Sequence, residues 1–169
     1  MYMKNYKKII TAGVFAALIC VLTAFLQIPI ISGQGYVHLG DAVIYLAASI
    51  LPTPYAAAAA AIGGGLADVL SGSPVWAPAT IIIKALLTLS FTSRKTKLLC
   101  GRNALASAIG MPITVAGYYI AEALIYGSWV TPAASVIWNV AQAGASAAVF
   151  IIAAAALDKL SFKEKFSKQ

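Results

Sequence analysis

The positions of the lysines and arginines constrain this chain more than any other feature of its sequence. Eleven of the 12 basic residues lie in three clusters, at residues 4–8, 94–102 and 159–168, and long apolar stretches separate the clusters. Charged residues make up only 10% of the chain, whereas a soluble domain carries about 25%. So few charges cannot cover a water-exposed surface, and the pattern therefore indicates an integral membrane protein.

The apolar stretches predict six transmembrane helices, because a spanning helix needs roughly 20 residues. We expect one transmembrane domain over residues 1–169, with helices at 9–28, 38–51, 55–70, 78–91, 104–126 and 133–157. The second stretch is short for a span. Gly110 and Pro112 are expected to interrupt the fifth helix, with a kink at the proline. The predicted fold class is an all-α membrane bundle.

The basic clusters also predict the orientation of the bundle. Membrane proteins concentrate lysine and arginine in their cytoplasmic loops. With a cytoplasmic N-terminus, six crossings place all three clusters inside, and the predicted outer loops at 29–37, 71–77 and 127–131 contain no lysine or arginine. Five or seven helices would put one terminal cluster outside. Both termini are therefore predicted to be cytoplasmic.

A few ionisable residues fall within or beside the apolar stretches, where burying a charge in the membrane is energetically unfavourable. They are His38, Asp41, Asp68, Lys84 and Glu122. A charge at the centre of a bilayer costs at least ~2.5–3.5 kcal/mol, so each group needs a partner or a function. All five are expected in the outer half of the bundle, and we predict that they gather there.

Aromatic and amide side chains are expected at the same depth as these ionisable groups. Concave sites with aromatic walls and a few polar groups are the usual form of small-molecule pockets. The predicted substrate-binding residues are Tyr36, His38, Asp41, Asp68, Trp76, Lys84, Tyr118, Glu122, Trp138, Asn139 and Gln142.

Most of these residues could instead have a purely structural role. Lys84 would then form an ion pair with Asp68 or Asp41. The corresponding structural roles are a helix cap for His38, a helix-dipole contact for Asp41, hydrogen bonds to another helix for Asn139 and Gln142, and an interfacial aromatic belt for Tyr36 and Trp76. The convergence of many polar groups on one side, rather than any single residue, is the basis for predicting a pocket.

Four segments together resemble a known family. They are KKIITAGVFAAL at residues 7–18, YVHLGDAVI at 36–44, GGLADVLSG at 64–72 and APATIIIK at 77–84. Within the first, Ala12 and Ala16 match an Ala-x-x-x-Ala motif. With the chain length and the predicted six helices, these segments resemble the substrate-binding S components of energy-coupling factor (ECF) vitamin transporters, over nearly the whole chain.

This resemblance implies a mechanism and a set of partners. An S component in the cell membrane of a prokaryote binds a vitamin from outside and docks on a transmembrane coupling subunit, and two ATPase subunits drive import. By this resemblance Ala12 and Ala16 form the docking surface, and no cofactor is expected. The chain has no G-x-x-x-x-G-K-[ST] phosphate loop, so ATP hydrolysis is expected to come from the partners.

The predicted polar inventory gives some information about the substrate. One lysine stands against three carboxylates, which disfavours a strongly anionic ligand such as folate. Aromatic rings with an amide pair suit a flat, neutral or weakly basic ring. Pyridoxine and hydroxymethylpyrimidine fit this inventory best, and riboflavin and thiamine also fit.

Two rival functions are weighed against vitamin capture. A stand-alone channel or transporter needs a polar path through both leaflets, whereas the predicted inner half is almost wholly apolar. An intramembrane hydrolase would pair Ser146 with His38, the single histidine, but Ser146 is expected deeper in the membrane, out of hydrogen-bond reach. We therefore predict no enzyme. One histidine and two separated cysteines predict no metal site, and the basic clusters do not form a nucleic-acid surface.

Overall fold

The computed structural model describes residues 5–29 and 36–168, and among these it leaves out the side chains of residues 28, 29, 36, 37, 167 and 168. The main helices are α1 (Asn5–Ala24), α2 (Gly40–Ile50), α3 (Thr53–Leu70), α4 (Ala77–Leu87), α5 (Gly101–Tyr126) and α6 (Val136–Lys159), followed by the short α7 (Phe162–Lys168). Single 3₁₀ turns, η1 (Pro74–Trp76), η2 (Thr88–Ser90) and η3 (Thr131–Ser135), flank α4 and precede α6. Strands β1 (Gln27–Pro29) and β2 (Tyr36–His38) pair antiparallel.

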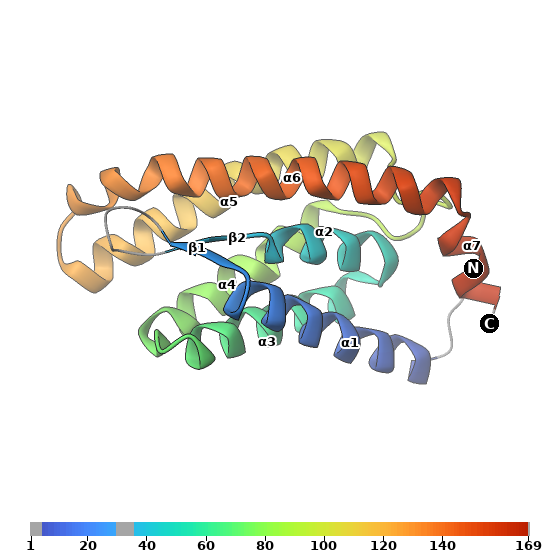
Figure 1. Cartoon of the computed structure of the whole chain (residues 1–169), viewed down its shortest axis with the longest axis horizontal. Coiled ribbons are helices and arrows are strands. Elements are labelled where there is room, and N and C mark those ends of the chain that lie inside the picture. Colours follow the sequence, from blue (N-terminus) through green and yellow to red (C-terminus); the bar gives the residue numbers. More distant parts are fainter. Residues whose placement is uncertain (1–4, 30–35, 169) are drawn as a thin grey trace.

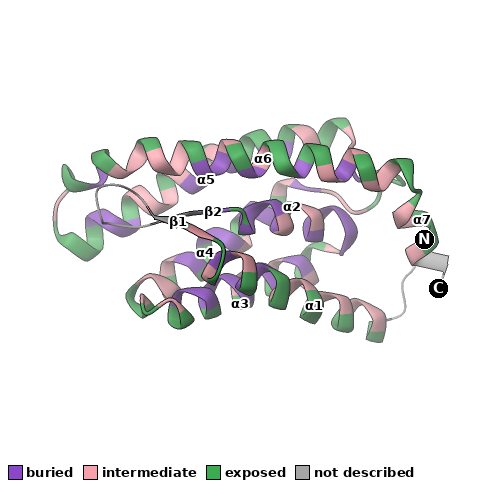
Figure 2. Ribbon diagram, viewed as in Figure 1, coloured by how far each residue is buried: buried purple, intermediate pink, exposed green. Residues whose placement is uncertain are grey.

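Helix α2 lies at the centre of the molecule. Helices α5 and α6 run side by side along one side of it, and α1, α3 and α4 form the opposite side (Figure 1). α2 contacts all five of these helices and is buried along nearly its whole length (Figure 2). An 11-residue helix is about 16 Å long, roughly half the hydrocarbon thickness of a bilayer. Because neighbouring helices enclose α2, it does not have to face lipid along its length.

Small residues on α3 bring three helices close together. A Cβ atom added at Gly63 would lie 2.6 Å from the carbonyl oxygen of Ala16 on α1, and one added at Gly65 would lie 2.7 Å from Cγ1 of Ile81 on α4. No real Cβ atom fits at such distances. The glycines therefore serve close backbone approach, as small residues do between membrane helices.

The outward surfaces of the helices are apolar. Exposed leucine, isoleucine and valine side chains occur along α1, α3, α4, α5 and α6, in the positions coloured green in Figure 2. Among the described helices, Asn5–Ala24, Gly101–Tyr126 and Thr131–Lys159 are long and apolar enough to cross a membrane, and Gly40–Ile50 and Pro74–Ser90 are shorter apolar segments. Such a surface is stable in lipid and would aggregate in water.

The region between α1 and α2 differs from the prediction. The first helix ends at Ala24, not at residue 28, and the chain continues into β1. His38, expected at the start of a helix, lies in β2 and pairs with Gln27. Hydropathy alone does not separate a short apolar strand from a helix end. The predicted outer loop at 29–37 falls largely outside the described residues.

Helix α5 also differs from the prediction. It begins at Gly101 rather than residue 104, and it continues without a break through Gly110 and Pro112. The predicted interruption is therefore wrong. Neighbouring helices can hold a proline-containing helix together in a membrane bundle. Gly110 is required for packing, because a Cβ atom there would collide with the hydroxyl of Tyr45 on α2.

The residues around the second basic cluster form an ordered segment. The buried Asn103 side chain accepts a hydrogen bond from the backbone N–H of Thr92 at 2.8 Å and donates to the carbonyl of Leu98 at 2.9 Å. Asp158 near the end of α6 accepts backbone N–H groups of Leu98 and Leu99. These contacts hold the segment at the same end of the molecule as the start of α1 and as α7 (Figure 1).

Candidate functional site

A buried ion pair joins α2 and α4. Nζ of Lys84 lies 2.6 Å from Oδ1 of Asp41, and the two side chains are 1% and 0% exposed. Of the two partners that the sequence offers for Lys84, Asp41 is the one that the structure places against it. A fully buried pair needs further hydrogen bonds to offset the loss of hydration.

Gln142 on α6 supplies one of these hydrogen bonds. Its amide nitrogen donates a hydrogen bond to Oδ2 of Asp41 at 3.3 Å, and its carbonyl oxygen accepts a hydrogen bond from the backbone N–H of His38 at 3.4 Å. The backbone N–H of Gly40 donates to Nδ1 of His38 at 3.1 Å. Strand β2, α2, α4 and α6 are thus tied together at the start of α2.

Aromatic residues extend this cluster toward the end of α5. Nζ of Lys84 lies 5.2 Å from the ring centroid of Tyr118, a cation–π distance. The Tyr118 hydroxyl is hydrogen-bonded to Thr80, one turn before Lys84 on α4, at 3.2 Å. Trp76 packs at 6.4 Å from Tyr118 and 6.2 Å from Tyr126, between ring centroids. We call Asp41, Lys84, Gln142, Tyr118 and Thr80 the polar network, and Trp76, Tyr118 and Tyr126 the aromatic group.

Helices α2, α5 and α6 each carry a buried hydroxyl group one helical turn from their residue of the polar network. Tyr45 follows Asp41 by four residues, Ser146 follows Gln142 by four, and Thr114 precedes Tyr118 by four. None of the three hydroxyls has a hydrogen-bond partner among the described residues. Buried polar groups usually have a hydrogen-bond partner. These three hydroxyls are therefore buried polar groups whose hydrogen bonds are not supplied by the described residues. Spacing by four from a predicted site residue is the signal that identifies these residues and Thr80, which the sequence analysis missed.

Several predicted site residues lie apart from the polar network. The Glu122 carboxylate accepts the hydroxyl of Ser135, which fixes η3 on α5. Trp138 and Asn139 are half-buried on α6 and form no side-chain hydrogen bond with a described residue. Asp68, by contrast, is buried on α3, close enough for its charge to act on Tyr118 of the polar network. The side chain of Tyr36 lies outside the described ones.

Ser146 and His38 do not form a nucleophile and base pair. The Ser146 hydroxyl is buried and has no hydrogen bond to any described residue. Nucleophilic catalysis by serine requires a base within hydrogen-bond reach. No group of three or more histidine, cysteine, aspartate or glutamate side chains is placed to hold a metal ion within the described part of the chain.

Ala12 and Ala16 are half-buried on α1 rather than fully outward. Ala12 packs against the hydrophobic core, and the backbone of Ala16 approaches Gly63 of α3. Nine of the 20 residues of α1 are nevertheless exposed, including Gly13, Val14 and Ala17. The helix therefore presents a broad apolar surface, with the two alanines along its inner border.

An apolar helical bundle with a buried polar network defines this chain as a polytopic membrane protein rather than a soluble domain. The family model described as the S component of the ECF-type riboflavin transporter matches residues 3–159. The chain belongs to this family, which consists of transporter components and is not an enzyme family. A protein of Pyrococcus woesei described as an uncharacterised protein in a gap 3′ region is 33% identical over 111 residues, covering 64% of this chain and 74% of that protein.

Proposed function

We propose that this protein captures riboflavin from outside a prokaryotic cell and delivers it for ATP-driven import by an ECF coupling subunit and two ATPase subunits. The observation that carries the proposal is the match of the riboflavin-type S component family to nearly the whole chain. The family comparison favours riboflavin over pyridoxine and hydroxymethylpyrimidine, which the residue inventory alone favours. Thiamine, which also fits the inventory, is the fourth candidate.

The chemistry around the start of α2 suits a flavin. The aromatic group offers ring faces for a flat, three-ring ligand. Gln142 and Asn139 carry amides that match the alternating donors and acceptors on the polar edge of a flavin, and the Asn139 amide has no described hydrogen-bond partner. We place the ligand between the aromatic group and α6, above the polar network.

The proposed topology has six membrane crossings and cytoplasmic termini. Its support is the arrangement of the basic residues: Lys8, Arg94, Arg102 and Lys163, drawn from all three clusters, line one groove at one end of the molecule. The polar network lies at the opposite end of α2, about 14 Å away along the helix axis. The positive end would face the cytoplasm, and the flavin site would open outward.

Purification in detergent followed by mass spectrometry of bound small molecules tests the proposed substrate. We expect riboflavin at close to one molecule per chain, and quenching of tryptophan fluorescence on titration with riboflavin but not with pyridoxine, hydroxymethylpyrimidine or thiamine. Saturable binding of one of these three compounds would reassign the substrate. No binding of any of the four would favour the stand-alone channel instead.

Bulky residues on α1 test the proposed docking surface. Ala12→Trp and Ala16→Trp are expected to reduce riboflavin uptake to background in cells that contain the coupling subunit and both ATPases, because small residues allow close approach of a partner helix. Riboflavin binding by the purified variants is expected to stay at the wild-type level. Ala148→Trp, at an exposed alanine of α6, is the matched control and should leave uptake unchanged. Loss of binding in the α1 variants would show that this face serves packing on α3.

A further inference from the structure

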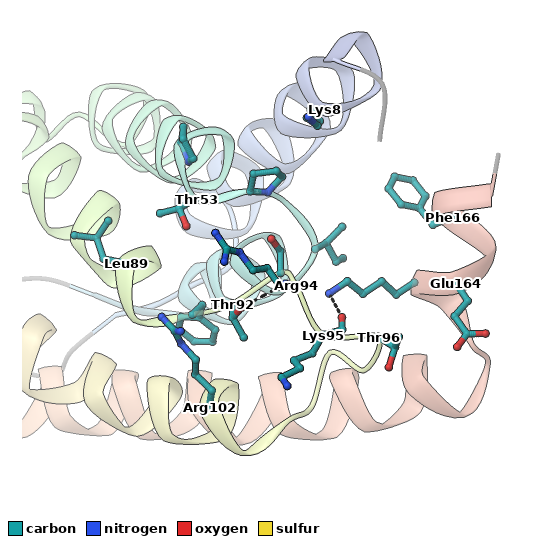
Figure 3. Close-up of a pocket in the computed structure, with 16 residues that line it drawn as sticks. Lys8, Thr53, Leu89, Thr92, Arg94, Lys95, Thr96, Arg102, Glu164 and Phe166 are labelled. Carbon is teal, nitrogen blue, oxygen red and sulfur yellow. Dashed lines mark hydrogen bonds between the residues drawn. The ribbon is translucent and has the colours of Figure 1, made fainter. Parts of the chain in front are cut away.

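A groove with a volume of about 880 Å³ opens at the basic end of the molecule (Figure 3). It lies between the start of α1, the junction of α2 and α3, the end of α4, the segment before α5, and α7. Five cationic side chains line it against a single carboxylate, that of Glu164: Lys8, Arg94, Lys95, Arg102 and Lys163. The groove is separate from the polar network and has no part in the proposed capture of riboflavin.

Four of the basic side chains of the groove keep their charge available for a ligand. Nζ of Lys163 donates to the carbonyls of Ser49 and Lys95, both at 2.7 Å, and Nε of Arg102 donates to the carbonyl of Ser90 at 3.1 Å. These carbonyls orient the cations without cancelling their charge. Arg94 and Lys95 are exposed and form no ion pair with a described residue. Desolvation lowers the pKa of Lys163 to about 8, so a bound anion would stabilise its charged form.

Apolar side chains form another part of the groove lining. Ile50, Leu89, Phe91 and Phe166 stand beside the cations. Leu89 lies in η2 and is exposed, and Leu86 and Ile82 on α4, three and seven residues earlier, are exposed along the same side. An exposed apolar stripe therefore runs from the groove along the outer surface of α4, in the direction of the helix axis. We call Ile82, Leu86 and Leu89 the α4 stripe.

We propose that this groove binds the phosphate headgroup of an anionic phospholipid of the inner leaflet, with an acyl chain lying along the α4 stripe. A free phosphate or nucleotide would use the cations but would leave the stripe uncovered. A phospholipid matches both parts, and basic pockets between membrane helices on the cytoplasmic side are suited to anionic headgroups. The lipid would link α1, α4, α5 and α7 at the end of the molecule where the proposed docking helix begins.

Native mass spectrometry of the detergent-purified chain with added phosphatidylglycerol or phosphatidylcholine tests this proposal. We expect one phosphatidylglycerol to be retained in preference to phosphatidylcholine. Arg94→Gln with Lys95→Gln is expected to weaken phosphatidylglycerol binding by about 25-fold, since each basic residue near a membrane surface contributes about a fivefold effect. Lys8→Gln, on a different element, is a second variant with an expected loss of about fivefold.

The matched control is Lys97→Gln with Lys165→Gln, which removes two exposed lysines that do not line the groove. Equal retention of phosphatidylcholine, or an equal loss of binding in this control, would overturn the proposal in favour of general surface charge. Competition by inorganic phosphate or glycerol phosphate as strong as that by the lipid would overturn it in favour of a soluble anion. Riboflavin binding is expected to be unchanged in all of these variants, so failure here is distinct from failure of the proposed function.

Discussion

Replacing Lys84 with methionine is expected to lower the free energy of unfolding by about 3–5 kcal/mol, the usual effect of removing one partner from a buried ion pair. The reason is the carboxylate that remains. Asp41 is fully buried, and without Lys84 it retains only the 3.3 Å hydrogen bond from Gln142 among its described side-chain partners. Methionine has nearly the volume of the lysine stem, so the loss reports the charge and not a cavity.

The measurement is the thermal unfolding midpoint in detergent, which we expect to fall by about 6–20 °C. The double variant Asp41→Asn with Lys84→Met removes both charges and is expected to recover much of this loss, because a neutral pair has no unpaired charge to bury. Lys97→Met, at an exposed lysine, is the control and should leave the midpoint unchanged. A double variant less stable than Lys84→Met would show that the pair is not the source of the effect.

Replacing Trp76 with alanine is expected to weaken riboflavin binding by about 5- to 150-fold, the range found when an aromatic residue that stacks on a flat heterocycle is removed. Trp76 is half-buried and is held by contacts with Tyr118 and Tyr126, so its ring is positioned before a ligand arrives. A preorganised ring loses little conformational entropy on binding. The effect should therefore appear as faster dissociation of riboflavin.

Fluorescence of riboflavin itself, quenched on binding, measures this affinity without relying on the protein's tryptophans. Trp129→Ala is the matched control, because Trp129 is 63% exposed and lies outside the aromatic group. It should bind riboflavin like the wild type. Equal weakening in the two variants would move the site away from the aromatic group, and no weakening in either would remove Trp76 from the proposed site.

The long helices were predictable from the sequence because their signal is local. Residues 101–126 and 136–159 are continuous helices close to the predicted 104–126 and 133–157. The start of the second helix was harder to predict from the sequence. Residues 27–29 and 36–38 pair as strands, and no nearby periodicity distinguishes three apolar residues in a strand from three in a helix end.

The residues of the polar network were largely predictable from the sequence, but the contacts between them were not. Five residues were placed at similar depth from their positions in the apolar stretches, and the structure brings them together: His38, Asp41, Lys84, Tyr118 and Gln142. Glu122 was grouped with them by the same reasoning, yet its carboxylate accepts a hydrogen bond from Ser135 instead. Depth in a bilayer restricts a residue to a layer, whereas the rotation of its helix decides which neighbour it meets.

The amino-acid sequence by itself determined that this chain resides in a membrane and which segments carry its basic residues. Both properties follow from the free energy of transferring each residue into lipid, which depends little on distant parts of the chain. Only the tertiary structure decided that Lys84 pairs with Asp41, 43 residues away, and that Gln142, 101 residues away, completes the contact. Such pairs depend on close helix approach, as at Gly64, where an added Cβ atom would lie 3.1 Å from Cγ of Lys84, and on helix rotation, and these are properties of the packed bundle as a whole.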